Sequence, residues 1–130
     1  MIPFGYAGKM LRVDLSHRTF SNEDLDSHFI KGYIGGAGFG ARYLFQENPD
    51  QVEWSDPQNR IIFANGPLSG TLVGGSGTIC VTSKGPMTNL AGSSQANGYW
   101  GAFLKSCGYD GLVIHGYSDQ YEPNAHIFLS

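Results

Sequence analysis

The segment that decides the fold spans residues 95–116 and reads QANGYWGAFLKSCGYDGLVIHG. Its pattern predicts a glycine-rich loop, a helix over 99–106, a glycine turn and an apolar strand at 112–114. Asn97 and Gly98 stand just before the helix, where backbone N–H groups have no partner within the helix. Such helix entrances attract anions, because the helix dipole adds to the free donors. We therefore expect an anion site at this helix entrance.

The composition predicts a single globular domain over residues 1–130. The net charge is −3 and no run of Lys or Arg occurs, which argues against nucleic-acid binding. No stretch approaches the roughly 20 apolar residues that span a bilayer, so we expect no membrane partner. Cys80 and Cys107 form no metal-binding pattern and are predicted to be reduced, buried thiols of a cytoplasmic protein.

The order of predicted elements indicates an α+β fold, with mixed or antiparallel sheets and two or three short helices. Ser21 and Asp24 resemble a capping box that opens a short helix running to Ile30. A second helix, over 39–46, is expected to point Phe45 into the core. Strands are predicted at 9–15, near 19–20, and at 60–64, 77–82, 112–114 and 126–129.

Glycine is unusually frequent, with 19 residues in three clusters that mark tight turns or close backbone approaches. Residues 36–41 fit the loose dinucleotide pattern, but the flanking segments lack the Rossmann context, so a glycine-packed helix start is the better interpretation. Residues 65–71 and 74–78 are predicted to form one hairpin end. That end is either a mobile loop or a surface for a flat ligand, and composition alone leaves both open.

Other side chains of possible chemical interest have ordinary structural explanations. The four histidines share no short spacing, which argues against a metal site built from them. Asp110 lies between Tyr109 and Gly111 and is interpreted as a turn residue. The aromatic residues of the helix over 99–106 have a spacing typical of core packing.

Five stretches of distinctive sequence follow one another along the chain. Four are GYAGKMLRVDL at 5–15, GGAGFGA at 35–41, NRIIFANGPLSGT at 59–71 and SKGPMT at 83–88. The fifth is the segment from Asn97 to Gly116, with Leu104-Lys105 and Gly108-Tyr109-Asp110-Gly111. In this order and at this spacing, they resemble the N-terminal part of the tungsten-containing aldehyde ferredoxin oxidoreductase family.

The resemblance implies a β-rich base of two similar, intertwined repeats, of which this chain corresponds to about the first. In the family this base carries tungsten (or molybdenum) held by the dithiolenes of two pterins. The glycine-rich segments would face pterin, and the Asn97 carbonyl would hold a Mg²⁺ that bridges the pterin phosphates. The residues so implied as cofactor-binding are Gly75, Ser76, Gly77, Thr78, Ala96, Asn97 and Gly98.

The sequence departs from the family pattern in two ways. Family members commonly carry an Arg between a pterin and an iron–sulfur cluster, and Thr78 stands at that position here. The cysteines that ligate the [4Fe–4S] cluster lie further downstream in the family, and neither Cys80 nor Cys107 matches them. We therefore expect no catalytic residue in this chain.

Two functional hypotheses follow. In the first, the chain is a fragment or truncated homologue of an enzyme that oxidises aldehydes to carboxylates and passes electrons to ferredoxin. It would bind part of the cofactor and be catalytically silent alone. In the second, it is a stand-alone structural or assembly module that has lost the cofactor. A homodimer would then cover bare sheet edges and apolar surface.

Overall fold

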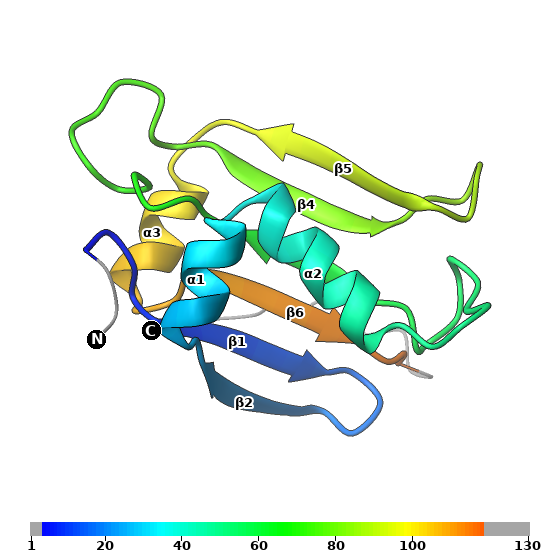
Figure 1. Cartoon of the computed structure of the whole chain (residues 1–130). Coiled ribbons are helices and arrows are strands. Elements are labelled where there is room, and N and C mark those ends of the chain that lie inside the picture. The colour runs from blue at the N-terminus through cyan, green and yellow to red at the C-terminus, as the bar shows by residue number, and fades with distance from the viewer. Residues whose placement is uncertain (1–3, 119–130) are drawn as a thin grey trace.

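A computed structural model describes residues 4–118, which form a six-stranded sheet and three helices (Figure 1). The strand order is β2-β1-β6-β3-β4-β5, and β1 with β6 is the parallel pair among otherwise antiparallel neighbours. The predicted α+β class is therefore confirmed. The elements are β1 (Lys9–Asp14), β2 (Thr19–Asp24), α1 (Ser27–Tyr33), α2 (Ala37–Glu47), β3 (Ile61–Ala64), β4 (Ile79–Lys84), β5 (Ala91–Ala96), α3 (Trp100–Ser106) and β6 (Gly111–His115).

The core lies between the sheet and the helices α1 and α2, which cover one of its faces (Figure 1). Phe39 and Tyr43 of α2 are buried against Ile62 of β3 and Val113 of β6. Burial of such side chains is worth about 1.5–3 kcal/mol each, so this layer makes a large contribution to stability. No helix in the described part of the chain is long and apolar enough to cross a membrane.

Glycines let α2 approach the sheet closely, as expected for residues 36–41. A Cβ added at Gly40 would lie 2.2 Å from the Thr82 hydroxyl oxygen and 2.4 Å from the Thr82 Cβ. Gly36 directly precedes α2. Its φ of 52° is a backbone conformation that residues with a side chain rarely adopt. The glycine-packed helix start is thus confirmed, and these glycines serve packing.

The opposite face of the sheet carries α3 at one end and an apolar stripe beside it. Trp100 of α3 contacts Phe63, with ring centroids 5.5 Å apart. Because side chains alternate along a strand, Phe63 points away from the core residue Ile62. The strand register aligns the stripe across four strands on this same face: Phe20, Val13, Ile114 and Ile61. Its two end residues are 78% and 43% exposed.

The predicted start of the first helix was wrong. Ser21 and Asp24 belong to β2, where they pair with β1. The helix begins at Ser27, and its cap is Asp26, whose carboxylate accepts from the backbone N–H groups of His28 at 2.6 Å and Phe29 at 2.8 Å. The cap is therefore Asp26, two residues after Asp24, and residues 19–24 remain in the strand.

Three other expectations need correction. Cys107 is partly exposed, although both cysteines were predicted to be buried. Phe45 does not face the core but is 84% exposed. The strand expected at 77–82 runs over Ile79–Lys84, and a strand at Ala91–Ala96 was not predicted at all. The strand expected at 126–129 lies outside the described residues.

Candidate functional site

The structure brings together the two segments implied as cofactor-binding, 75–78 and 96–98. They meet because β4 pairs with β5, so that Ile79 lies opposite Ala96. Just beyond this pair, a Cβ added at Gly77 would lie 2.1 Å from the Gly98 carbonyl oxygen, so only glycine permits the approach. The Thr78 hydroxyl donates to the Asn97 side-chain oxygen at 2.5 Å. We call these seven residues the glycine platform.

The glycine platform is uncharged, and its residues are exposed or partly exposed. Ala96, Asn97 and Gly98 are exposed, and added Cβ atoms at Gly75 and Gly98 would meet nothing within 4 Å. Residues 65–78 and 91–101 contain no Asp, Glu, Lys or Arg. A ligand here would meet backbone groups and small side chains, which suits a flat molecule recognised through hydrogen bonds along its edge.

The helix behind the glycine platform is shorter than expected. It begins at Trp100 and spans seven residues, with no side-chain hydrogen bond at its N-cap, Tyr99. Its C-terminal end follows the sequence prediction: Gly108 has φ of 89°, and its N–H donates to the Lys105 carbonyl. Tyr109 then donates to the Leu104 carbonyl, which completes a Schellman motif.

Asp110 lies in the turn between α3 and β6, as predicted, but its burial was not predicted. Its side chain is fully buried and accepts from the N–H groups of Ala7 at 3.1 Å and Gly8 at 2.6 Å. It also forms an ion pair with Lys105. Its sequence context, Tyr-Asp-Gly, is typical of an exposed turn, so no local signal could have revealed the burial.

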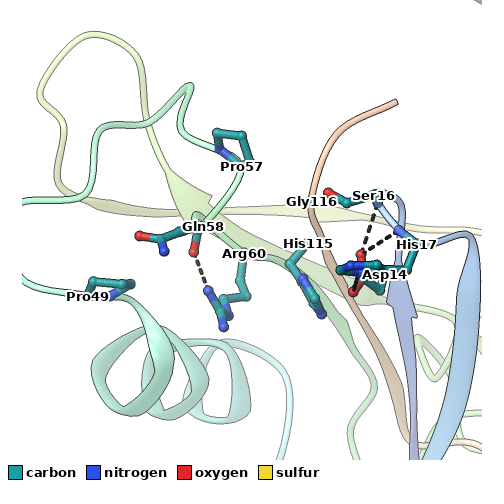
Figure 2. Close-up of a pocket in the computed structure, with 9 residues that line it drawn as sticks. All are labelled: Asp14, Ser16, His17, Pro49, Pro57, Gln58, Arg60, His115 and Gly116. Carbon is teal, nitrogen blue, oxygen red and sulfur yellow. Dashed lines mark hydrogen bonds and ion pairs between the residues drawn. The ribbon is translucent and has the colours of Figure 1, made fainter. Parts of the chain in front are cut away.

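A pocket of about 310 Å³ lies at the far end of β1 and β6, away from the glycine platform (Figure 2). Asp14 there accepts from the N–H groups of Ser16 at 2.9 Å and His17 at 3.2 Å, and from the His17 ring at 2.7 Å. The hydrogen bond from the His17 ring is the main reason that the pKa of Asp14 is lowered. The lining residues are Asp14, Ser16, His17, Pro49, Pro57, Gln58, Arg60, His115 and Gly116.

The charged groups of this pocket, Asp14 and Arg60, are used within the fold. Arg60 pairs with Glu47 and donates to the Gln58 carbonyl, as Figure 2 shows for the latter bond. Glu47 in turn holds Arg12, with two hydrogen bonds at 2.8 and 2.6 Å. Within residues 4–118, no three His, Cys, Asp or Glu side chains are grouped so that they could hold a metal ion. We therefore interpret the pocket as a hollow formed by the turns at the ends of β1 and β6, and not as a ligand site.

The fold and the glycine platform define a mixed-sheet α+β domain that offers an uncharged, glycine-rich surface at one end of the sheet. Residues 10–123 match the family described as aldehyde ferredoxin oxidoreductase, N-terminal domain. The chain belongs to this family, as the resemblance of its motifs indicated.

Several curated proteins are similar to this chain. It is 39% identical over 116 residues to the tungsten-containing aldehyde ferredoxin oxidoreductase of Pyrococcus horikoshii, which covers 89% of this chain and 19% of the relative. It is 33% identical to the protein of the same name from Pyrococcus furiosus, in a match that covers 95% of this chain and 21% of the relative. The chain is also 34% identical to the aliphatic sulfonate oxidoreductase, WOR-like subunit, of Pyrococcus furiosus. That match covers 87% of this chain and 18% of the relative.

A solved structure supports the same relationship. The active site complex BamBC of benzoyl coenzyme A reductase, in complex with 1,5 dienoyl-CoA, contains a chain that matches with a TM-score of 0.87 and 33% identity. The match covers 90% of this chain and 18% of that one. This chain thus spans about a fifth of the length of the relatives that it matches.

Proposed function

We propose that this chain forms part of the base for a tungsten–pterin cofactor in an oxidoreductase that converts aldehydes to carboxylates with ferredoxin as electron acceptor. The observation that carries the proposal is the close approach of Gly77 to Gly98, which joins the two implied cofactor segments into one surface. The tungsten in the names of the relatives supports the choice of metal.

The residues of the glycine platform fit such a group. Exposed backbone without Cβ atoms lets N–H donors reach pterin ring edges and phosphate oxygens. The Asn97 backbone carbonyl is a hard oxygen ligand of the kind that Mg²⁺ prefers, and Mg²⁺ would link it to the phosphates. When bound, the cofactor supplies the two-electron chemistry.

The side chains of Thr78 and Asn97 would orient the backbone that faces the cofactor. The Thr78 hydroxyl holds the Asn97 side chain, which restrains the backbone at Asn97 where the Mg²⁺ ligand would lie. Thr78 is neutral, so the site offers no cation between the pterin and an iron–sulfur cluster. We propose that this chain binds and orients the cofactor, that the iron–sulfur cluster is held by other parts of the enzyme, and that the protein acts in the cytoplasm.

The test is cofactor analysis on protein purified without oxygen. We expect tungsten by mass spectrometry together with pterin by fluorescence after oxidation. Gly77→Ala places a Cβ 2.1 Å from the Gly98 carbonyl oxygen and should abolish both signals. Gly32→Ala is the matched control, because Gly32 lies in α1 and its added Cβ would meet nothing within 4 Å. Wild-type protein that never takes up pterin, even when supplied with it, would contradict the proposal.

A second candidate function is assembly through a homodimer, which β5 and the apolar stripe favour. β5 reads AGSSQA, and all six residues are exposed, without a charge or a proline. The other edge strand, β2, carries Glu23 and Asp24, which discourage pairing with another chain. A second copy could pair along β5 or cover the stripe that ends at Phe20 and Ile61.

Light scattering tests this candidate. A dimer that Ser94→Lys on β5 or Ile61→Lys on the stripe converts to monomer would support it, because a charge disfavours both kinds of contact. Ser21→Lys on β2 is the control and should leave the dimer intact. A wild-type monomer at high concentration would overturn the candidate.

A further inference from the structure

A buried polar cluster lies where the C-terminal end of α3, the N-terminal segment and the end of β3 meet. Asp110 and Lys105 are its centre, with side chains 0% and 14% exposed. Lys105 also donates to the Gly5 carbonyl at 2.9 Å. Asp110 accepts from the N–H groups of Ala7 and Gly8, so the N-terminal segment is held at both ends of residues 5–8.

This N-terminal segment reaches the loop that carries the glycine platform. A Cβ added at Gly5 would lie 2.7 Å from the Pro67 carbonyl oxygen, so the two backbones are in direct contact. Pro67 belongs to the loop between β3 and β4, whose far end is residues 75–78. The ion pair of Asp110 and Lys105 therefore holds the N-terminal segment against the start of the loop that ends in residues 75–78.

Asn65 connects the same cluster to the start of α3, which follows residues 96–98 of the glycine platform. Its N–H donates to the Asp110 carbonyl at 2.8 Å, and its side-chain amide donates to the Gly101 carbonyl at 2.9 Å. Gly101 lies in the first turn of α3, three residues after Gly98. Asn65 is only 1% exposed, so these hydrogen bonds are shielded from water.

We propose that Asp110, Lys105 and Asn65 form a positioning unit that fixes the backbone at the start of the β3–β4 loop and at the start of α3, the two segments that carry the halves of the glycine platform. The role rests on the proposed function, because the platform is the surface that it positions. None of the three residues would touch the cofactor. Their effect is on geometry, and a misplacement of about 1 Å at a site of this kind is enough to weaken binding strongly.

The experiment compares Asp110→Asn with Glu47→Gln, a control that breaks partly buried ion pairs to Arg12 and Arg60 remote from the platform. Both variants should lower the melting temperature. Binding is measured below both melting temperatures, as tungsten and pterin content after anaerobic reconstitution with the tungsten–pterin cofactor. We expect Asp110→Asn to reduce occupancy or affinity by about tenfold or more, and Glu47→Gln to stay within about twofold.

Amide hydrogen exchange provides a reading that needs no cofactor. Asp110→Asn should accelerate exchange in 65–78 and 96–101, whereas Glu47→Gln should accelerate it in α2 and β1 only. Lys105→Met should resemble Asp110→Asn. Unchanged exchange in the platform segments of Asp110→Asn, or equal loss of binding in both variants, would overturn the inference. If wild-type protein binds no pterin, the proposed function fails and hydrogen exchange still decides whether the unit positions these segments.

Discussion

Replacement of Gly40 by alanine should destabilise the protein, although alanine is the better helix former. The added Cβ would lie 2.4 Å from the Thr82 Cβ and 2.2 Å from its hydroxyl oxygen. To restore an ordinary contact of 3.4 Å, α2 must retreat from β4 by about 1 Å. That movement loosens Phe39 and Tyr43, which are 0% and 2% exposed. Overpacking of this kind costs about 1–3 kcal/mol.

In a domain of this size, such a loss lowers the melting temperature by about 4–12 °C, which circular dichroism or calorimetry would measure. Gly32→Ala is the matched control, because Gly32 lies in α1, is exposed, and has nothing within 4 Å of an added Cβ. It should raise the melting temperature by about 2–4 °C. Thr82→Gly should rescue Gly40→Ala, since it removes the opposing Cβ. A Gly40→Ala variant as stable as wild type would refute the close packing of α2.

Three further predictions concern stability and reactivity. Burial alone would raise the pKa of Glu47, but hydrogen bonds and ion pairs to two arginines outweigh it and lower the pKa. The stabilising effect of Glu47 is thus present near neutral pH and lost as the pH falls through the lowered pKa. In urea titrations, Glu47→Gln should lower the free energy of unfolding by about 2 kcal/mol at pH 7 and by much less near pH 3. Asp26→Ala should lower the melting temperature by about 4 °C, whereas Ser21→Ala should leave it unchanged; equal effects would restore Ser21 as the cap. In native protein, a thiol reagent should label Cys107, which is partly exposed, and reach the buried Cys80 only after unfolding.

The parts of the fold that the sequence predicts correctly depend on local patterns. The alternation at 9–15 and the apolar run at 60–64 correspond to β1 and β3 because buried strands need such patterns. The glycine turn at Gly108 was predictable because few other residues tolerate its backbone conformation. The family resemblance predicted the segments of the glycine platform as cofactor-binding candidates, and the pairing of β4 with β5 makes them neighbours.

The parts that were missed depend on contacts distant in sequence. β5 consists of small and polar residues that are exposed on both faces, and it is a strand only because β4 lies beside it. Asp110 is buried by residues 5–8, about 100 positions earlier in the chain. Phe45 points outward because α2 turns its Tyr43 and Leu44 toward the sheet instead. No window of neighbouring residues carries this information.

The place of β6 in the sheet has a consequence for how the chain folds. β6 follows the other five strands in sequence, yet it lies between β1 and β3 and is the strand that joins β1–β2 to β3–β4–β5. Met10 pairs with Gly111, about 100 residues later, so β1 waits roughly 5–20 s on the ribosome for its partner. Until then the nascent chain holds two separate hairpin assemblies with bare inner edges. Such long-range closure predicts slow folding and a need for protection from aggregation during synthesis.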